Sequence, residues 1–175
     1  MHIGRPGHEK NRARAVSILA SMVASGVDAV LVFVGRTMPE ENLQLAALAS
    51  REHVSDRVHV VGESDHVPRL LASADLTILT STREGLPGVV LESCAAGTPV
   101  LASALPGVRW LADTFPGVVP VSLNQADAAW ATAAGTCLEM PRGASARRQA
   151  LLEFEGSQFH ITCAAQRFLE LWTRP

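Results

Sequence analysis

The sequence predicts an α/β protein built on a doubly wound parallel sheet with helices on both faces. Short apolar segments alternate with segments of helical periodicity along most of the chain. The clearest apolar segment is AVLVFV, residues 29–34, a continuous run that ends at Gly35. Such runs are typical of strands that are buried on both faces. Strict alternation of strands and helices therefore favours a single, Rossmann-like domain.

The individual elements follow from their local patterns. In chain order, the expected strands cover residues 2–4, 29–34, 57–62, 76–81, 99–103 and 117–122. The expected helices cover residues 11–24, 39–52, 66–74, 87–97 and 107–113. From about Asn124 the chain is expected to be helical, with a surface connection at residues 139–148. Because the first strand begins almost at Met1, we expect the chain to start at a domain boundary or to have been cut there.

Two of the expected helices carry an apolar stripe. The first stripe consists of Ala15, Ile18, Leu19, Met22 and Val23. The second lies in the final helix, residues 159–172, and consists of Ile161, Ala164, Ala165, Phe168 and Trp172. We expect the second stripe to pack in the core or against a domain that the chain lacks.

Composition excludes several classes of function. Of the 175 residues, 47% are hydrophobic and 18% are charged, and the net charge is -2. This is the composition of a folded, soluble domain. Aromatic residues make up 5% and Tyr is absent, so we expect no nucleic-acid partner. The longest clean apolar run is too short to span a bilayer, and the first residues do not form a signal peptide.

The cysteines and histidines predict no metal site. Cys94, Cys137 and Cys163 are odd in number and far apart, which favours a reducing compartment, and we expect a cytoplasmic protein. Cys94 is expected to serve in packing. The six histidines lack metal-ligand spacing, and we interpret them as mostly surface residues or residues with satisfied hydrogen bonds.

A candidate anion site lies at the carboxyl ends of the strands, where doubly wound sheets bind ligands. Arg5 and Lys10 belong to the Pro/Gly-rich loop after the first strand. A helix begins near Pro87, which suits the first helical position, and Gly88 and Val89 then offer free backbone N–H groups. Two cations and these amides together predict a site for phosphate.

Two carboxylates, Glu84 and Glu92, flank this helix start in an otherwise apolar or Gly/Pro-rich stretch. Carboxylates bind hydroxyl groups well, and sugars are rich in hydroxyls. A phosphate site with a carboxylate on either side suits a ligand that has phosphate between two sugar rings. A nucleotide sugar has this structure.

In this order, the motifs resemble the C-terminal, donor-binding domain of family 4 glycosyltransferases of the GT-B fold, over most of the chain. HIGRPGHEKN resembles the family's G-R-x4-K loop, and VLVFVGRTMPEENLQLAALA resembles the next strand and helix. The most recognisable block is VHVVGESDHVPRLLASADLTILTSTREGLPGVVLESCAAGTPVLASALPGVRWLAD, which holds the E-x7-E pair. SARRQALLEFEGSQFHITCAAQRFLELW resembles the closing helices.

The resemblance implies a role for each residue of the site. Arg5 and Lys10 would bind the donor diphosphate and stabilise the charge on the leaving group. Glu84 would contact the transferred sugar, Glu92 the ribose hydroxyls, and Ser64 in the loop 62–65 the nucleobase. The full set of implied donor-binding residues is Gly4, Arg5, Lys10, Ser64, Glu84, Gly85, Leu86, Pro87, Gly88, Val89 and Glu92, of which Glu84, Arg5 and Lys10 would be catalytic.

The implied enzyme is a retaining, metal-independent hexosyltransferase of the kind found in polysaccharide biosynthesis. Its donor would be a UDP-, GDP- or ADP-sugar, with no other cofactor and no metal, and its acceptor a glycan or a lipid-linked molecule. Residues 1–175 would form the donor domain alone. The N-terminal acceptor domain would be absent, so we expect the isolated chain to be inactive and any contact with the inner face of the membrane to be made through that other half.

Three alternatives remain open on the sequence. The chain could be a free-standing donor subunit that needs a separate acceptor-binding partner. It could also be a non-enzymatic module that uses a Rossmann-like fold for partner contact. Sugar-nucleotide epimerases of the GT-B fold are a weaker match, because they lack this combination of loop and E-x7-E pair.

Overall fold

Six parallel strands form the centre of the protein in a computed structural model that describes residues 1–173. One half of the sheet contains β1 (His2–Ile3), β2 (Leu31–Val34) and β3 (Val58–Gly62), and the other contains β4 (Thr77–Leu79), β5 (Val100–Ser103) and β6 (Val118–Val121). Every strand pair within each half is parallel. This confirms the predicted sheet and the position of its strands.

The two halves meet edge to edge between β1 and β4. The backbone N–H of Ile78 donates a hydrogen bond of 2.8 Å to the carbonyl oxygen of Met1, and β1 and β4 are in contact. The spatial order is therefore β3-β2-β1-β4-β5-β6. In such a doubly wound sheet, the chain reverses its direction of travel between β1 and β4.

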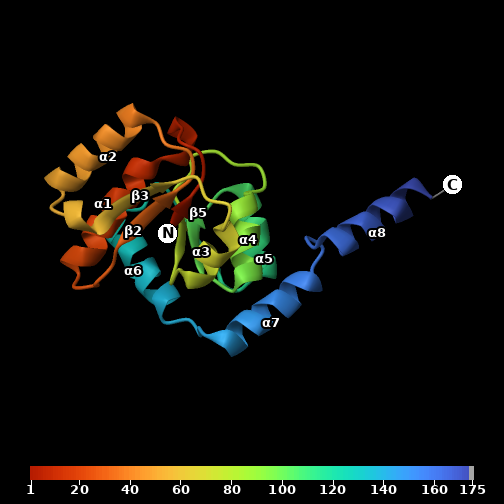
Figure 1. Ribbon diagram of the computed structural model, residues 1–175. Helices are drawn as coiled ribbons and strands as arrows, with labels where there is room; N and C mark the ends of the chain where they lie inside the picture. Colours follow the sequence, from red (N-terminus) through yellow and green to blue (C-terminus); the bar gives the residue numbers. More distant parts are fainter. Residues whose placement is uncertain (174–175) are drawn as a thin grey trace.

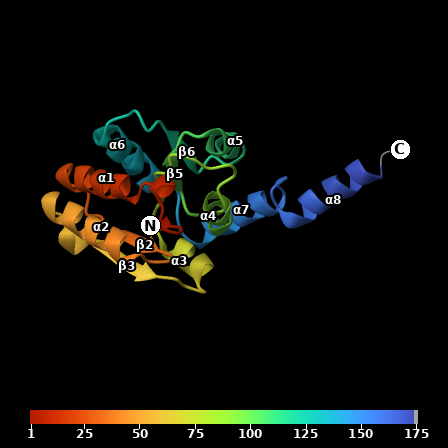
Figure 2. The ribbon, with the colours of Figure 1, turned by 90° about the horizontal axis from the view of Figure 1, so that it is seen from above.

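Helices cover both faces of the sheet (Figures 1 and 2). One face carries α1 (Arg12–Ala24), α2 (Pro39–Arg51) and α6 (Asp127–Leu138), and the other carries α3 (Val67–Ser73), α4 (Gly88–Ala96) and α5 (Pro106–Thr114). Two short 3-10 turns, η1 (His8–Lys10) and η2 (Ser55–Arg57), lie in the loops. After α6, α7 (Ala144–Glu155) packs on α4, and α8 (Ile161–Trp172) extends away from the sheet (Figure 1).

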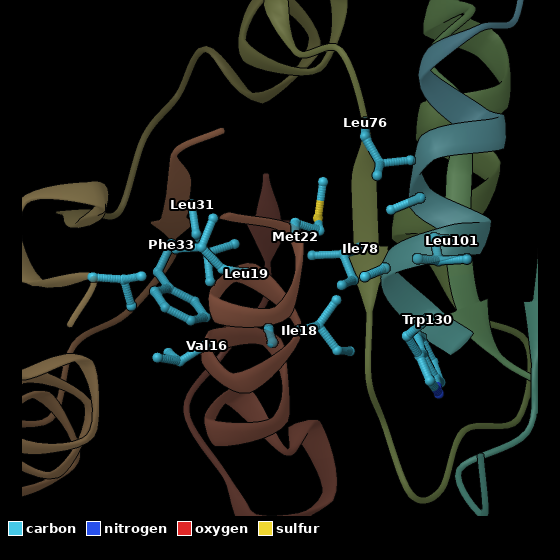
Figure 3. Close-up of a cluster of buried hydrophobic side chains, with 14 of the residues drawn as sticks. Val16, Ile18, Leu19, Met22, Leu31, Phe33, Leu76, Ile78, Leu101 and Trp130 are labelled. Carbon is cyan, nitrogen blue, oxygen red and sulfur yellow. The ribbon is translucent and has the colours of Figure 1, made fainter. Parts of the chain in front are cut away.

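The main core lies between the sheet and the α1/α6 layer (Figure 3). Ile18 and Leu19 of α1 are buried against Phe33 of β2 and Ile78 of β4. This explains the predicted stripe on α1, because residues three and four apart share one face of a helix. Trp130 of α6 is fully buried, and its indole N–H donates to the carbonyl oxygen of Ser122 at 3.1 Å.

Two expectations about the C-terminal part are corrected. The predicted surface connection at residues 139–148 ends earlier, because α7 begins at Ala144. Of the two alternatives for the stripe of α8, packing in the core is wrong, because Ile161 is 76% exposed and Trp172 is 87% exposed. Packing against a domain that the chain lacks stays a prediction. None of the helices in residues 1–173 combines the length and the apolar character that a bilayer-crossing segment needs.

Candidate functional site

Two loops lie next to each other at the point where the strand order reverses. The loop after β1 begins at Gly4 and leads into α1, and the loop after β4 begins at Thr80 and leads into α4. Because α1 and α4 lie on opposite faces of the sheet, the two loops diverge and leave a crevice between them. This is the edge at which the sequence predicts a phosphate site.

Hydrogen bonds join the two loops into one unit. The backbone N–H of Thr82 donates to the carbonyl oxygen of Glu9 at 2.8 Å. The buried hydroxyl of Thr80 donates to the carbonyl oxygen of Asn11 at 2.9 Å. The positions of Lys10 and Glu84 are therefore fixed relative to one another.

A cavity of about 450 Å³ occupies the crevice. The predicted site residues that line it are Gly4, Arg5, Lys10, Glu84, Pro87, Gly88, Val89 and Glu92. Ile3 and Glu9 complete the lining. The structure thus brings together the parts of the predicted site that come from the two loops and from α4.

Three predicted residues do not line this cavity. The Ser64 hydroxyl accepts a hydrogen bond from the backbone N–H of His66 at 3.1 Å, in the turn after β3. Gly85 and Leu86 are exposed in the loop before α4. The implied donor-binding roles of Ser64, Gly85 and Leu86 stay predictions.

A cavity of similar size lies at the opposite edge of the sheet and lacks this chemistry. It measures about 490 Å³ and lies between the amino ends of β2 and β4, next to Val30 and Asp75. Its lining contains no Lys, Arg or His. The smaller cavity at the carboxyl edge is the better candidate, because Arg5 and Lys10 line it together with the free amides at the start of α4.

Lys10 and Glu84 form an ion pair inside the crevice. Lys10 Nζ lies 2.6 Å from Glu84 Oε1, and Ser81 Oγ donates to the same oxygen at 2.8 Å. The Lys10 and Glu84 side chains are 21% and 15% exposed. Glu84 Oε2 accepts no hydrogen bond within residues 1–173. One oxygen is thus held in place, while the other can accept a ligand hydroxyl.

The N-terminus of α4 supplies free donors. α4 begins at Gly88, so Pro87 is the N-cap residue and not, as predicted, the first helical residue. The Pro87 carbonyl accepts from the Val90 N–H at 3.1 Å, whereas the N–H groups of Gly88 and Val89 have no acceptor among the described residues. Free amides and the partial positive charge of the helix end favour an anion at this point.

Arg5 and Glu92 complete the site from its exposed rim. Both side chains line the cavity, both are exposed, and neither forms an ion pair within residues 1–173. The apolar neighbours of Glu92 in the sequence do not bury it, because Val90 and Cys94 turn toward the core on the other side of α4. Glu92 therefore faces the cavity and is available to a ligand.

Sequence reasoning missed two residues that support the loops. The Arg12 guanidinium is buried and donates to the carbonyl oxygen of Gly4. Gly107 of α5 lies against the backbone of Gly85, and a Cβ at Gly107 would run into the Gly85 carbonyl. A charged residue at a helix start normally indicates solvent, and a single Gly gives no specific signal. Neither contact could be foreseen from local patterns.

His2 is an exception to the expectation that the histidines are mostly surface residues or residues with satisfied hydrogen bonds. Its ring is fully buried in β1 beside Phe33, with 5.3 Å between ring centroids, and within residues 1–173 neither ring nitrogen makes a hydrogen bond of ordinary geometry. Burial, and secondarily the charge of Arg12, lowers the pKa of His2 to about 3. The ring is therefore neutral in the folded protein at ordinary pH.

Replacing His2 by Phe is expected to make the protein less sensitive to acid. The unfolded chain takes up a proton at His2 near pH 6.5 and the folded chain only near the lowered pKa, so stability is lost as pH falls between these values. Between pH 7 and pH 5 this coupling should lower the free energy of unfolding by about 2 kcal/mol. Urea unfolding at both pH values checks it: the loss should shrink by that amount in His2→Phe, and an equal loss in both proteins would refute the assignment.

Nothing in the described part of the chain resembles a metal centre. Residues 1–173 hold no group of three or more His, Cys, Asp or Glu side chains placed to bind a metal ion. Cys94 is buried, and burial raises the pKa of its thiol to about 12. This supports a packing role for Cys94.

Comparison with known proteins gives one consistent family. The family model described as "Glycosyl transferases group 1" matches residues 1–133. The 2-deoxystreptamine glucosyltransferase of Streptomyces kanamyceticus is 31% identical over 120 residues, which are 67% of this chain and 30% of that protein. The lipopolysaccharide glucosyltransferase WaaG of Escherichia coli is 32% identical over 121 residues, which are 68% of this chain and 32% of that protein.

Solved structures show the same fold. Anabaena HepE in complex with UDP superimposes with a TM-score of 0.81 and 22% identity, over 98% of this chain and 47% of that one. HepE has also been solved with UDP-glucose. A structure of WaaG gives a TM-score of 0.75 over 99% of this chain and 47% of WaaG. The chain thus spans less than half the length of these structures, and it has the α/β fold of a GT-B glycosyltransferase domain. On the match of the family model over most of its length, the chain belongs to the group 1 glycosyl transferases.

Proposed function

We propose that the chain binds the nucleoside diphosphate of a sugar donor in the crevice between the loops after β1 and β4. One observation carries the proposal: Arg5, Lys10 and the free amides of Gly88 and Val89 line one cavity together with the carboxylates of Glu84 and Glu92, and Glu9 lines its edge as a third carboxylate. Cations and amides suit a diphosphate, and carboxylates suit hydroxyls. Family membership and the UDP complexes of HepE support the same ligand class.

The two carboxylates divide the ligand between them in this proposal. Glu84 lies deep in the crevice beside Lys10, where it would accept hydrogen bonds from the transferred sugar. Glu92 lies one turn into α4, on the far side of the free amides, where it would accept from the ribose. The diphosphate then lies over the start of α4, between the two sugars.

The proposed reaction is sugar transfer with retention of anomeric configuration and without a metal ion. The bond between the anomeric carbon and the diphosphate oxygen breaks, a bond to an acceptor hydroxyl forms, and the acceptor proton leaves with the diphosphate. Arg5 and Lys10 would stabilise the negative charge that develops on the leaving diphosphate, a task that a metal ion performs in other enzymes. Glu84 is the carboxylate closest to Lys10 and would hold the sugar during transfer.

We further propose that residues 1–175 act as the donor domain of a larger cytoplasmic enzyme. The solved relatives are more than twice as long as the part that matches, which leaves room for an acceptor domain in the same polypeptide or in a partner subunit. The acceptor would be a glycan or a lipid-linked molecule. Alone, the chain should bind a donor weakly and turn it over negligibly, because the crevice stays open to water.

Calorimetric titration with UDP, GDP and ADP tests the binding proposal. One of the diphosphates should bind, in the presence of EDTA as well as in its absence, and Arg5→Ala should weaken that binding about tenfold, as expected for a lost charge-assisted hydrogen bond. Arg36→Ala is the matched control, since Arg36 is equally exposed but follows β2 and does not line the cavity. Equal affinity of Arg5→Ala and the unsubstituted chain would place the site elsewhere.

A further inference from the structure

We propose that Arg12 is a positioning residue that holds the loop bearing Arg5 and Lys10 in its ligand-binding shape by anchoring the carbonyl group of Gly4. The inference rests on the proposed function, because it assigns a purpose to this loop. Arg12 does not line the cavity and would not touch the ligand. Its effect would pass through the backbone.

The guanidinium of Arg12 is held on three sides. Its Nη2 donates to the Gly4 carbonyl, its Nη1 lies 3.2 Å from Glu41 Oε2 on α2, and its central carbon lies 5.5 Å from the centre of the Phe33 ring. The Arg12 side chain is only 1% exposed. Such a buried guanidinium is costly to displace, because losing the contact with Gly4 or with Glu41 leaves a buried polar group unpaired.

The anchored peptide lies directly beneath the Lys10 side chain. The Gly4 N–H donates to the Val34 carbonyl at 3.0 Å, so the strand and Arg12 hold Gly4 from both ends. Lys10 Cε passes 3.6 Å from the position that a Cβ on Gly4 would take. A shift of the Gly4 peptide would therefore move the stem of Lys10 and the start of Arg5.

Glu41 stabilises the buried positive charge of Arg12. Burial lowers the pKa of the guanidinium, and the neighbouring Glu41 opposes this change. Glu41 thus stabilises the Arg12 charge from α2, none of whose residues lines the crevice. A purely structural role for Arg12 would require only its ion pair with Glu41. The hydrogen bond from Arg12 to the Gly4 carbonyl in addition connects this ion pair to the loop of the site.

Arg14 offers a matched control on the same turn of α1. It pairs with Asp127 at 2.6 Å and faces α6, away from the loop. Arg12→Met and Arg14→Met each remove one partly or fully buried cation and one ion pair from the start of α1. Only the first change releases Gly4.

The experiment compares UDP and UMP binding by calorimetry, together with amide hydrogen exchange of Lys10 and Asn11 in the unliganded chain. Arg12→Met should weaken the binding of UDP about tenfold and the binding of UMP less than about threefold. The reason is that we expect the loop with Arg5 and Lys10 to bind the second phosphate, which UMP lacks. Arg12→Met should also speed exchange at Lys10 and Asn11, whose amides bond to Gly7 and His8. Arg14→Met should leave the UDP/UMP ratio and both exchange rates unchanged.

Each outcome decides the proposal. If Arg12→Met and Arg14→Met lower the melting temperature alike and leave the UDP/UMP ratio unchanged, Arg12 is only structural. If Arg12→Met does not fold, Glu41→Gln is measured in its place. It should change the UDP/UMP affinity ratio and the exchange rates of Lys10 and Asn11 in the same direction, by a smaller factor. If the unsubstituted chain binds none of UDP, GDP and ADP, the proposed function fails, and the exchange rates still decide whether Arg12 orders the loop. If it binds GDP or ADP and not UDP, that diphosphate and its monophosphate replace UDP and UMP in the comparison.

Discussion

Lys10→Met is expected to lower the affinity of the chain for UDP by about 100-fold. Two effects add. The ligand loses a charge-assisted hydrogen bond, and Glu84, which lies 2.6 Å from Lys10 Nζ and is only 15% exposed, loses the cation that neutralises it. An unpaired carboxylate then faces the incoming phosphate. Calorimetric titration with UDP measures the loss, and melting temperatures show whether the fold is kept.

Glu84→Gln should strengthen the binding of UDP and weaken the binding of the sugar. The amide releases Lys10 from its ion pair and removes a negative charge, so UDP should bind about two- to fivefold more tightly. Any advantage of UDP-glucose over UDP should disappear, because the carboxylate that would accept from the sugar is gone. If both substitutions weaken UDP equally, Lys10 and Glu84 do not divide the ligand as proposed.

Gly107→Ala is expected to weaken UDP binding about 30-fold while leaving the fold intact. The new Cβ would run into the carbonyl oxygen of Gly85 and lie 3.0 Å from its carbonyl carbon. Because α5 packs against the body of the domain, the exposed loop is the part that must move. That loop carries Glu84 at one end and the start of α4 at the other, so both halves of the site shift.

Gly135→Ala is the control for this substitution. Gly135 also lies in a helix, α6, and a Cβ there meets nothing within 4 Å. Its replacement should raise stability by up to about 1 kcal/mol through helix propensity and leave UDP affinity unchanged. Thermal unfolding and calorimetry of the two variants separate the effects. Unchanged UDP affinity in Gly107→Ala would mean that the ligand does not depend on the loop at Gly85.

The fold could be predicted because its strands and helices show as patterns of neighbouring residues in the sequence. Buried parallel strands show as continuous apolar runs, and AVLVFV ends at Gly35, where β2 ends and the backbone of Gly4 comes close. The loops that line the crevice could be predicted for the same reason, since every loop after a parallel strand lies at one edge of the sheet. The sequence predicted an anion site that contains Lys10 and Glu84, and the cavity lies there. The sequence did not predict that these two side chains, 74 positions apart in the sequence, are in direct contact.

What the sequence could not show are contacts made by side chains between distant elements. Arg12 and His2 are polar, and their burial depends on Glu41 of α2 and Phe33 of β2, which no local pattern connects to them. The stripe of α8 shows that one face of the helix is apolar, but not which surface covers it. An amphipathic pattern predicts the need for a partner and leaves the partner open.

We propose that the diphosphate of the donor lies between the loop after β1 and the start of α4. Titration of the ¹⁵N-labelled chain with UDP, followed through its backbone amide resonances, tests this claim most directly. We expect the resonances of Gly88 and Val89 to shift most, together with those of Arg5 and Lys10, and the amides of α6 and α8 to stay unchanged. Saturable binding with the largest shifts outside the cavity, at α6 or α8, would contradict it.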